Sequence, residues 1–111
     1  TRDFADAGFF AALKEGAILV NVARGALIVD AAMLAALDEG RLAAAVLDVF
    51  RQEPLPEGDP LWSHPKVRVT SHTSSSGNGS FLRWEQLFLD NIVRYVRGDA
   101  LENEVNPKDI V

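Results

Sequence analysis

The sequence of 111 residues contains no cysteine, which excludes disulfides, thiolate metal ligands and a cysteine nucleophile. No apolar run approaches the roughly 20 residues of a membrane helix. The first residues also lack the basic start and apolar stretch of a secretory signal. Eleven Lys and Arg against 16 Asp and Glu give a formal net charge of −5, which argues against a dedicated nucleic-acid binder. We therefore expect a cytoplasmic protein without a metal site.

Two further absences concern the chain as a whole. It does not begin with Met, and it opens almost directly into what resembles the middle of a fold. The dinucleotide fingerprint G-x-G-x-x-G is also missing. Gly77-Asn78-Gly79 comes nearest, but the position of the third glycine is Leu82. We interpret this stretch as a flexible entry to the following helix rather than a phosphate loop.

What is present is typical of one soluble globular domain, with 48% apolar and 24% charged residues. Apolar spacing and turn residues alternate between helix-like and strand-like segments. We predict helices over 6–14, 31–39 (capped by Asp30) and 80–97, strands over 17–22, 43–50 and 67–70, and a loop over 51–65.

The apolar runs of the first two strands lack polar alternation, which is typical of parallel strands buried on both faces. Helices alternating with such strands predict an α/β fold with a parallel sheet. Trp62, Trp84 and the aromatic stripe of the last helix are interpreted as core or interface packing, and His64 as structural or exposed.

Four chemically distinct side chains follow the three predicted strands. Arg24 comes after the first strand, Asp48 and Glu53 after the second, and His72 after the third. Ligands of such sheets bind outside the carboxyl ends of the strands, where neighbouring ends lie about 5 to 10 Å apart. Arginine can bind a carboxylate through two hydrogen bonds, and histidine transfers protons near neutral pH. A carboxylate beside a histidine can fix its tautomer.

Each of these residues also has a simpler interpretation. Arg24 is equally compatible with a solvated turn, Asp48 with a residue that caps local amides, and Glu53 with an exposed loop. His72 is equally compatible with a hydrogen-bonded structural histidine. Only their joint placement at successive strand ends favours a site.

The segments NVARG, LDVF followed by EP, and HPKVRVTSH together resemble the D-isomer-specific 2-hydroxyacid dehydrogenase family. The similarity runs from Phe9 to His72, and more loosely to Asn106, and it covers the C-terminal half of the NAD(P)-binding domain. The segment DVFRQEPLP is most similar to the glyoxylate/hydroxypyruvate reductase branch of the family. The resemblance implies a doubly wound, Rossmann-like parallel sheet.

The resemblance also implies roles for individual residues. Arg24 would bind the substrate carboxylate, His72 would act as acid and base, and Glu53 would be its carboxylate partner. Asp48 would hold the nicotinamide carboxamide. The positions implied to contact NAD or NADP are Val22, Ala23, Arg24, Asp48, His72, Ser74 and Ser75. The family usually has proline before the histidine and small apolar residues after it, whereas this chain has Ser71 and Thr73 to Ser76.

From the same resemblance we expect residues 1–98 to be the C-terminal half of the cofactor domain. Residues 99–111 would be a tail that returns to a substrate domain. The phosphate loop would then lie outside the chain, so the isolated piece would bind cofactor poorly and show little turnover. The expected enzyme reduces a small 2-oxo acid with NAD(P)H and forms a homodimer. The alternative is a non-catalytic NAD(H)-binding regulatory module, similar to the corepressors related to this family.

Overall fold

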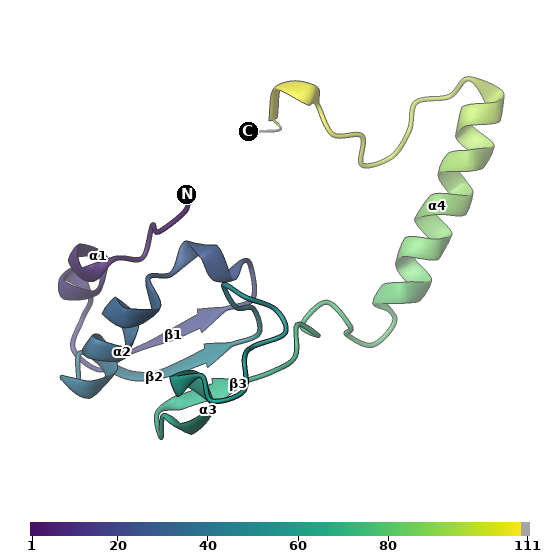
Figure 1. The fold of residues 1–111 in the computed structure, drawn as a ribbon. Coiled ribbons are helices and arrows are strands. Elements are labelled where there is room, and N and C mark those ends of the chain that lie inside the picture. Colours follow the sequence, from purple (N-terminus) through teal and green to yellow (C-terminus); the bar gives the residue numbers. More distant parts are fainter. Residues whose placement is uncertain (110–111) are drawn as a thin grey trace. The chain divides into compact units, whose positions relative to one another are not determined.

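The computed structural model describes residues 1–109 of the chain (Figure 1). It contains two compact units, the first spanning Thr1–Ser74 and the second starting at Ser75. None of the helices within residues 1–109 is long and apolar enough to cross a membrane.

The first unit is built on a three-stranded parallel sheet, as predicted. The strands β1 (Ala17–Asn21), β2 (Leu42–Leu47) and β3 (Val67–Val69) lie in the order β1-β2-β3. Asn21 pairs with Leu47, and Leu47 pairs with Val69. The last residues of all three strands therefore form one row across the sheet, and the segments that follow them leave from the same edge.

Three helices accompany this sheet: α1 (Ala7–Ala12), α2 (Asp30–Asp38) and the single-turn α3 (Pro60–Ser63). Asp6 caps α1, because its carboxylate accepts a hydrogen bond from the Phe9 N–H at 2.9 Å. The predicted cap of α2 is wrong by one residue. Asp30 is the first helical residue, and its carboxylate turns to Arg51 at 3.7 Å instead of to the helix N-terminus.

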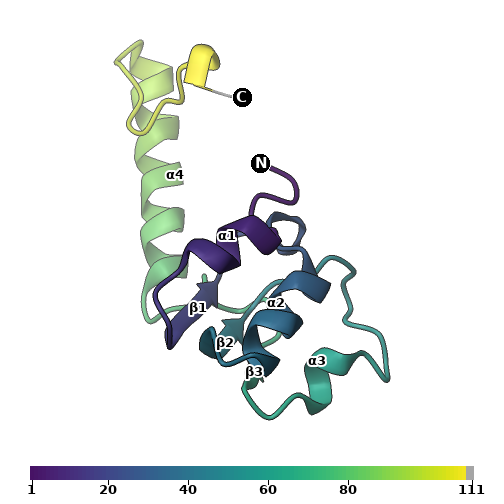
Figure 2. The same ribbon diagram turned by 90° about the vertical axis from the view of Figure 1, so that its left-hand side faces the viewer.

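The apolar core lies between α2 and β2, where Met33, Leu37, Leu42 and Ala45 are fully buried. Figure 2 shows α1 and α2 on the same side of the strands. The prediction that the strands are buried on both faces is therefore wrong for this unit. Side chains alternate along a strand, so Ile18 and Val20 point away from these helices and are 65% and 60% exposed.

The predicted loop over 51–65 contains α3. The Asp59 carboxylate accepts a hydrogen bond from the Leu61 N–H at 2.9 Å, and Pro60 supplies a backbone angle suited to a first helical residue. A helix of a single turn is too short to show a helical periodicity of apolar residues in the sequence. Trp62 lies on this turn and is 56% exposed. Of its two predicted roles, core and interface packing, the core role is therefore wrong.

The second unit contains α4 (Ser80–Arg97), whose bounds agree with the predicted helix. Gly79 and Gly98 flank it in left-handed conformation, with φ values of 75° and 76°. None of the residues of α4 is buried. Of the two roles predicted for Trp84 and the aromatic stripe, core and interface packing, the core role is therefore wrong for this unit. The tail after α4 contains a 3₁₀ turn over Pro107–Asp109, and residues 110–111 lie outside the described part.

Candidate active site

The three loops that leave the carboxyl edge of the sheet meet around a shallow hollow of about 300 Å³. Arg24 from the loop after β1, Glu53 from the loop after β2 and His72 from the loop after β3 all line it. The structure thus brings together the three residues that the sequence placed at successive strand ends. The remaining lining residues are Gly25, Ala26, Phe50 and Arg51.

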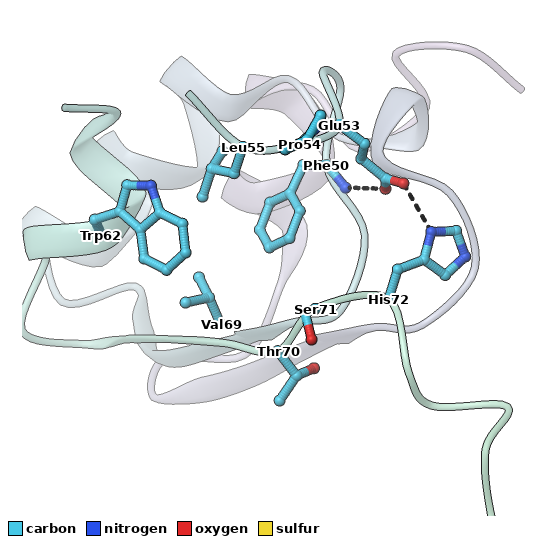
Figure 3. A pocket seen from close by; sticks show the side chains of 9 residues that line it. All are labelled: Phe50, Glu53, Pro54, Leu55, Trp62, Val69, Thr70, Ser71 and His72. Atoms are coloured by element: carbon cyan, nitrogen blue, oxygen red, sulfur yellow. Dashed lines mark hydrogen bonds and ion pairs between the residues drawn. The ribbon is translucent and has the colours of Figure 1, made fainter. Parts of the chain in front are cut away.

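His72 and Glu53 form a direct hydrogen-bonded pair. The imidazole Nδ1 lies 2.7 Å from the Glu53 Oε2, and the other carboxylate oxygen accepts a hydrogen bond from the Phe50 N–H at 2.9 Å (Figure 3). The contact with His72, and then the contact with the Phe50 N–H, holds the pKa of Glu53 below its usual range. An ionised Glu53 favours the tautomer with a proton on Nδ1, which leaves Nε2 for chemistry in the hollow.

The backbone at His72 adopts the left-handed conformation, with φ of 54°. A residue with a side chain beyond Cβ is uncommon there, because its Cβ crowds the neighbouring carbonyl. The surrounding structure must therefore hold this conformation.

Asp48 is the buried acceptor beneath the His72 loop. It is only 2% exposed. Its Oδ1 accepts hydrogen bonds from the Thr70 hydroxyl and from the Thr73 N–H at 3.0 Å, and its Oδ2 accepts one from the Ser74 N–H at 2.9 Å. The Thr70 hydroxyl contributes most to holding the pKa of Asp48 well below its usual range, and the two amides add to it against the opposing effect of burial. Asp48 therefore caps amides, but those of a loop 25 and 26 residues further along the chain and not local ones.

Asn21 organises the loop that carries Arg24. Its side-chain amide donates to the Arg24 carbonyl at 3.0 Å, and its side-chain oxygen accepts from the Ala23 N–H at 3.1 Å. Its backbone carbonyl also accepts from the Asp48 N–H at 3.0 Å. Asn21 is 6% exposed and was not among the predicted site residues. The signal that could have revealed it is a polar residue at the end of an otherwise apolar strand.

Gly25 allows the Arg24 loop to touch the loop that carries Glu53. A Cβ at this position would lie 1.9 Å from the Phe50 carbonyl carbon and 2.5 Å from the Arg51 nitrogen. Only a residue without a side chain permits this backbone approach. Gly25 is thus a second residue of the site whose role the sequence did not reveal.

Arg24 offers an anion-binding group to the hollow. Its guanidinium donates to the Ala23 carbonyl at 2.7 Å, and none of the carboxylates described within residues 1–109 forms an ion pair with it. Its positive charge also contributes to the lowered pKa of Glu53. An arginine, a histidine and a carboxylate in this arrangement can bind a small carboxylic acid and transfer a proton to it.

The structure also locates the other residues that the resemblance implies as contacts of a nicotinamide cofactor. Val22 and Ala23 are exposed directly after β1, beside Arg24, at the sheet edge where such cofactors bind. Ser74 is exposed and gives its N–H to Asp48, while Ser75 belongs to the second unit, where its carbonyl accepts from the Ser80 hydroxyl at 2.9 Å. The sequence has no glycine-rich loop to hold the phosphates.

A larger apolar pocket of about 700 Å³ adjoins the hollow, and His72, Glu53 and Phe50 line both (Figure 3). Its other walls are Pro54, Leu55, Trp62, Val69, Thr70 and Ser71. His64 lies elsewhere, with Nε2 3.2 Å from Asp38 and Nδ1 accepting from the Lys66 N–H. This agrees with its predicted structural role.

Comparison with known proteins places these features in a family. Residues 1–74 match the model of the D-isomer specific 2-hydroxyacid dehydrogenase, NAD binding domain. The chain is 53% identical over 102 residues to glyoxylate/hydroxypyruvate reductase A of Serratia proteamaculans, covering 92% of this chain and 30% of that protein. It is 52% identical over 63 residues to the reductase of the same name from Salmonella paratyphi B, covering 57% of this chain and 20% of that one.

Solved structures agree with the sequence relatives. A D-isomer specific 2-hydroxyacid dehydrogenase from Xanthobacter autotrophicus, in complex with NADPH and MES, matches with a TM-score of 0.83 and 41% identity. That match covers 97% of this chain and 44% of the other. An NADPH-dependent glyoxylate/hydroxypyruvate reductase from Sinorhizobium meliloti, in complex with NADP and sulfate, matches with a TM-score of 0.82 and 34% identity, covering 96% and 34%. The chain thus spans less than half the length of each of these four proteins.

Proposed function

Because this chain belongs to the D-isomer specific 2-hydroxyacid dehydrogenase family, we propose that it supplies the acid–base site of an NAD(P)H-dependent reductase of small 2-oxo acids. The observation that carries the proposal is the pair of His72 Nδ1 and Glu53 Oε2 at 2.7 Å, in a hollow shared with Arg24. Glyoxylate and hydroxypyruvate are the proposed substrates, because the relatives at 52–53% identity bear their names.

In the proposed reaction, the Arg24 guanidinium binds the substrate carboxylate and orients its 2-oxo group. The His72 Nε2–H donates a proton to the carbonyl oxygen, which becomes the 2-hydroxyl group. Glu53 keeps Nδ1 protonated and stabilises the imidazolium before that transfer. A reduced nicotinamide, when bound, supplies the hydride to the 2-carbon. The reverse reaction uses His72 as the base that accepts the hydroxyl proton.

Val22, Ala23, Arg24, His72, Ser74 and Ser75 are proposed contacts of the nicotinamide end, as the family resemblance implies. Asp48 is proposed to lie near its carboxamide. Residues 1–98 are proposed to be the C-terminal half of the cofactor domain, with residues 99–111 returning to a substrate domain. We further propose that the complete enzyme is a homodimer. The support for these assignments is the family match and the share of the relatives that the chain covers.

The test is a chimera in which this chain replaces the matching segment of the Serratia proteamaculans reductase. Oxidation of NADPH and NADH is followed spectroscopically with glyoxylate and with hydroxypyruvate. We expect turnover, and a loss of about 10²- to 10⁴-fold in kcat for His72→Ala, the usual contribution of a general acid.

The matched control is His64→Ala, which removes the other histidine of the chain, outside the site. This variant should keep most of the activity. If His72→Ala retained most of the kcat, His72 would not be the acid. Tight binding of NADH without reduction of any 2-oxo acid would favour the regulatory-module alternative instead.

A further inference from the structure

We propose that Asp48 is a positioning residue that holds His72 in its left-handed backbone conformation, so that the imidazole meets Glu53. The inference deepens the proposed function, on which it rests for the role of His72. It assigns to Asp48 an action on the acid–base pair itself, through the loop of residues 70–74.

The contacts of Asp48 lie on both sides of His72 along the chain. One partner, the Thr70 hydroxyl, precedes the histidine by two residues, and the N–H groups of Thr73 and Ser74 follow it. A single carboxylate therefore closes the turn that contains Ser71 and His72. Neither Ser71 nor His72 donates a hydrogen bond to Asp48, so the hydrogen bonds to Asp48 hold the turn at its two ends.

This arrangement explains how His72 maintains an unfavourable backbone angle. A φ of 54° persists in a residue other than glycine only where neighbouring contacts hold it. In His72 these contacts are the Asp48 hydrogen bonds beneath the backbone and the Glu53 hydrogen bond to the ring. Loss of the first set would let the backbone relax to negative φ, and the ring would turn away from Glu53.

The burial of Asp48 favours this role over direct contact with a ligand. An ionised carboxylate offers about four acceptor positions, and three protein donors already occupy positions on Asp48. The residue is 2% exposed, whereas the side chains of His72 and Glu53 are 48% and 38% exposed. Buried Asp48 thus stabilises the loop that carries His72, while His72 and Glu53 remain exposed.

The experiment determines the tautomer of the His72 imidazole in this chain by long-range ¹H–¹⁵N NMR. We expect the wild-type chain to show the tautomer with the proton on Nδ1. In Asp48→Asn, the side-chain NH₂ group is a donor that faces the donor N–H groups of Thr73 and Ser74, so these hydrogen bonds weaken. We expect a mixture of His72 tautomers and faster exchange of the Thr73 and Ser74 amide protons. Asp6→Asn is the matched control, because Asp6 also accepts a backbone N–H and asparagine caps helices equally well.

A second pair of variants keeps the test decisive if Asp48→Asn does not fold. Thr70→Val removes only the hydroxyl donor at nearly constant shape, and Thr70→Ser retains that donor. We expect Thr70→Val to shift the His72 resonances toward the mixed pattern and Thr70→Ser to preserve the wild-type pattern. The amide signals of β1 and β2 report that the sheet stays folded.

An unchanged Nδ1 tautomer in a folded Asp48→Asn chain, or in Thr70→Val if the former does not fold, would overturn the proposal. If NADPH binding by the Asp48→Asn chimera were also weaker, Asp48 would be a cofactor ligand only. A chimera that lacks reductase activity while the tautomer still depends on Asp48 would refute the proposed function and leave the positioning role standing.

Discussion

At Gly25, the absence of a Cβ atom allows two loops of the site to lie against each other. We expect Gly25→Ala to destabilise the chain by about 1–3 kcal/mol, the usual cost of overpacking, because the added Cβ would overlap the Phe50 carbonyl carbon at 1.9 Å. The backbone atoms that it meets cannot move aside as a flexible side chain would. Urea unfolding followed by circular dichroism measures the change.

Gly77→Ala is the matched control for this substitution. An added Cβ there meets nothing within 4 Å, and the backbone does not require a positive φ. The control should leave the free energy of unfolding within about 0.5 kcal/mol of wild type. Equal stability of Gly25→Ala and Gly77→Ala would contradict the close approach of the two loops.

Glu53 links the acid–base pair to the pH dependence of stability. Its pKa is lower in the folded chain than in the unfolded chain, so the unfolded state binds more protons near pH 4. The stabilisation by Glu53 is therefore fully present above its ordinary pKa of about 4.3 and is lost as the pH falls through the lowered value. Because the Glu53 side chain is 38% exposed, added salt should weaken the effect.

Glu53→Gln isolates this contribution, because the other carboxylates titrate equally in both proteins. We expect wild type to be more stable than Glu53→Gln at pH 6, and the difference to shrink as the pH falls to 3. Urea unfolding at a series of pH values measures it. A difference that stays constant over this range would show that the charge of Glu53 does not stabilise the fold.

At the residue scale, the convergence of Arg24, Glu53 and His72 was more predictable than the contacts around them. Arg24, Glu53 and His72 follow apolar runs within a few residues, and a parallel sheet brings the segments after its strands to one edge. Asn21 and Gly25 act through contacts with backbone atoms that the sequence does not place. The three donors that surround Asp48 come from 22 to 26 residues further along the chain, so no local pattern reveals them.

At the scale of elements, the strength of the local signal decided which predictions succeeded. The helix α4 spans 18 residues with a clear apolar stripe between two glycines, and its predicted bounds are correct. The helix α3 has only four residues and begins at a proline, which was interpreted as part of a loop. The strands were located to within a few residues, because short apolar runs between turn residues are distinct.

Burial of those elements was less predictable, since it depends on what covers them. The runs of β1 and β2 have the composition of strands covered on both faces. In the first unit, however, the side chains of Ile18 and Val20 stay exposed. In the second unit, Phe81, Trp84 and Phe88 of α4 are 58–77% exposed. An apolar pattern thus identifies a surface that favours burial without identifying its partner.

At the scale of the whole molecule, exposed apolar side chains and a low isoelectric point predict association in mild acid. The net charge of −5 at pH 7 falls to zero near pH 4.9, where charge repulsion no longer opposes contact between exposed apolar surfaces. Sedimentation velocity should therefore show association that increases between pH 7 and pH 5. The double variant Ile18→Thr/Val20→Thr should associate less at the same pH, because threonine keeps strand propensity and removes apolar surface without changing the charge. Phe88→Ser tests the apolar stripe of α4 in the same way. If only Phe88→Ser reduced the association, the contact would lie on α4, and the predicted role of Ile18 and Val20 would be wrong.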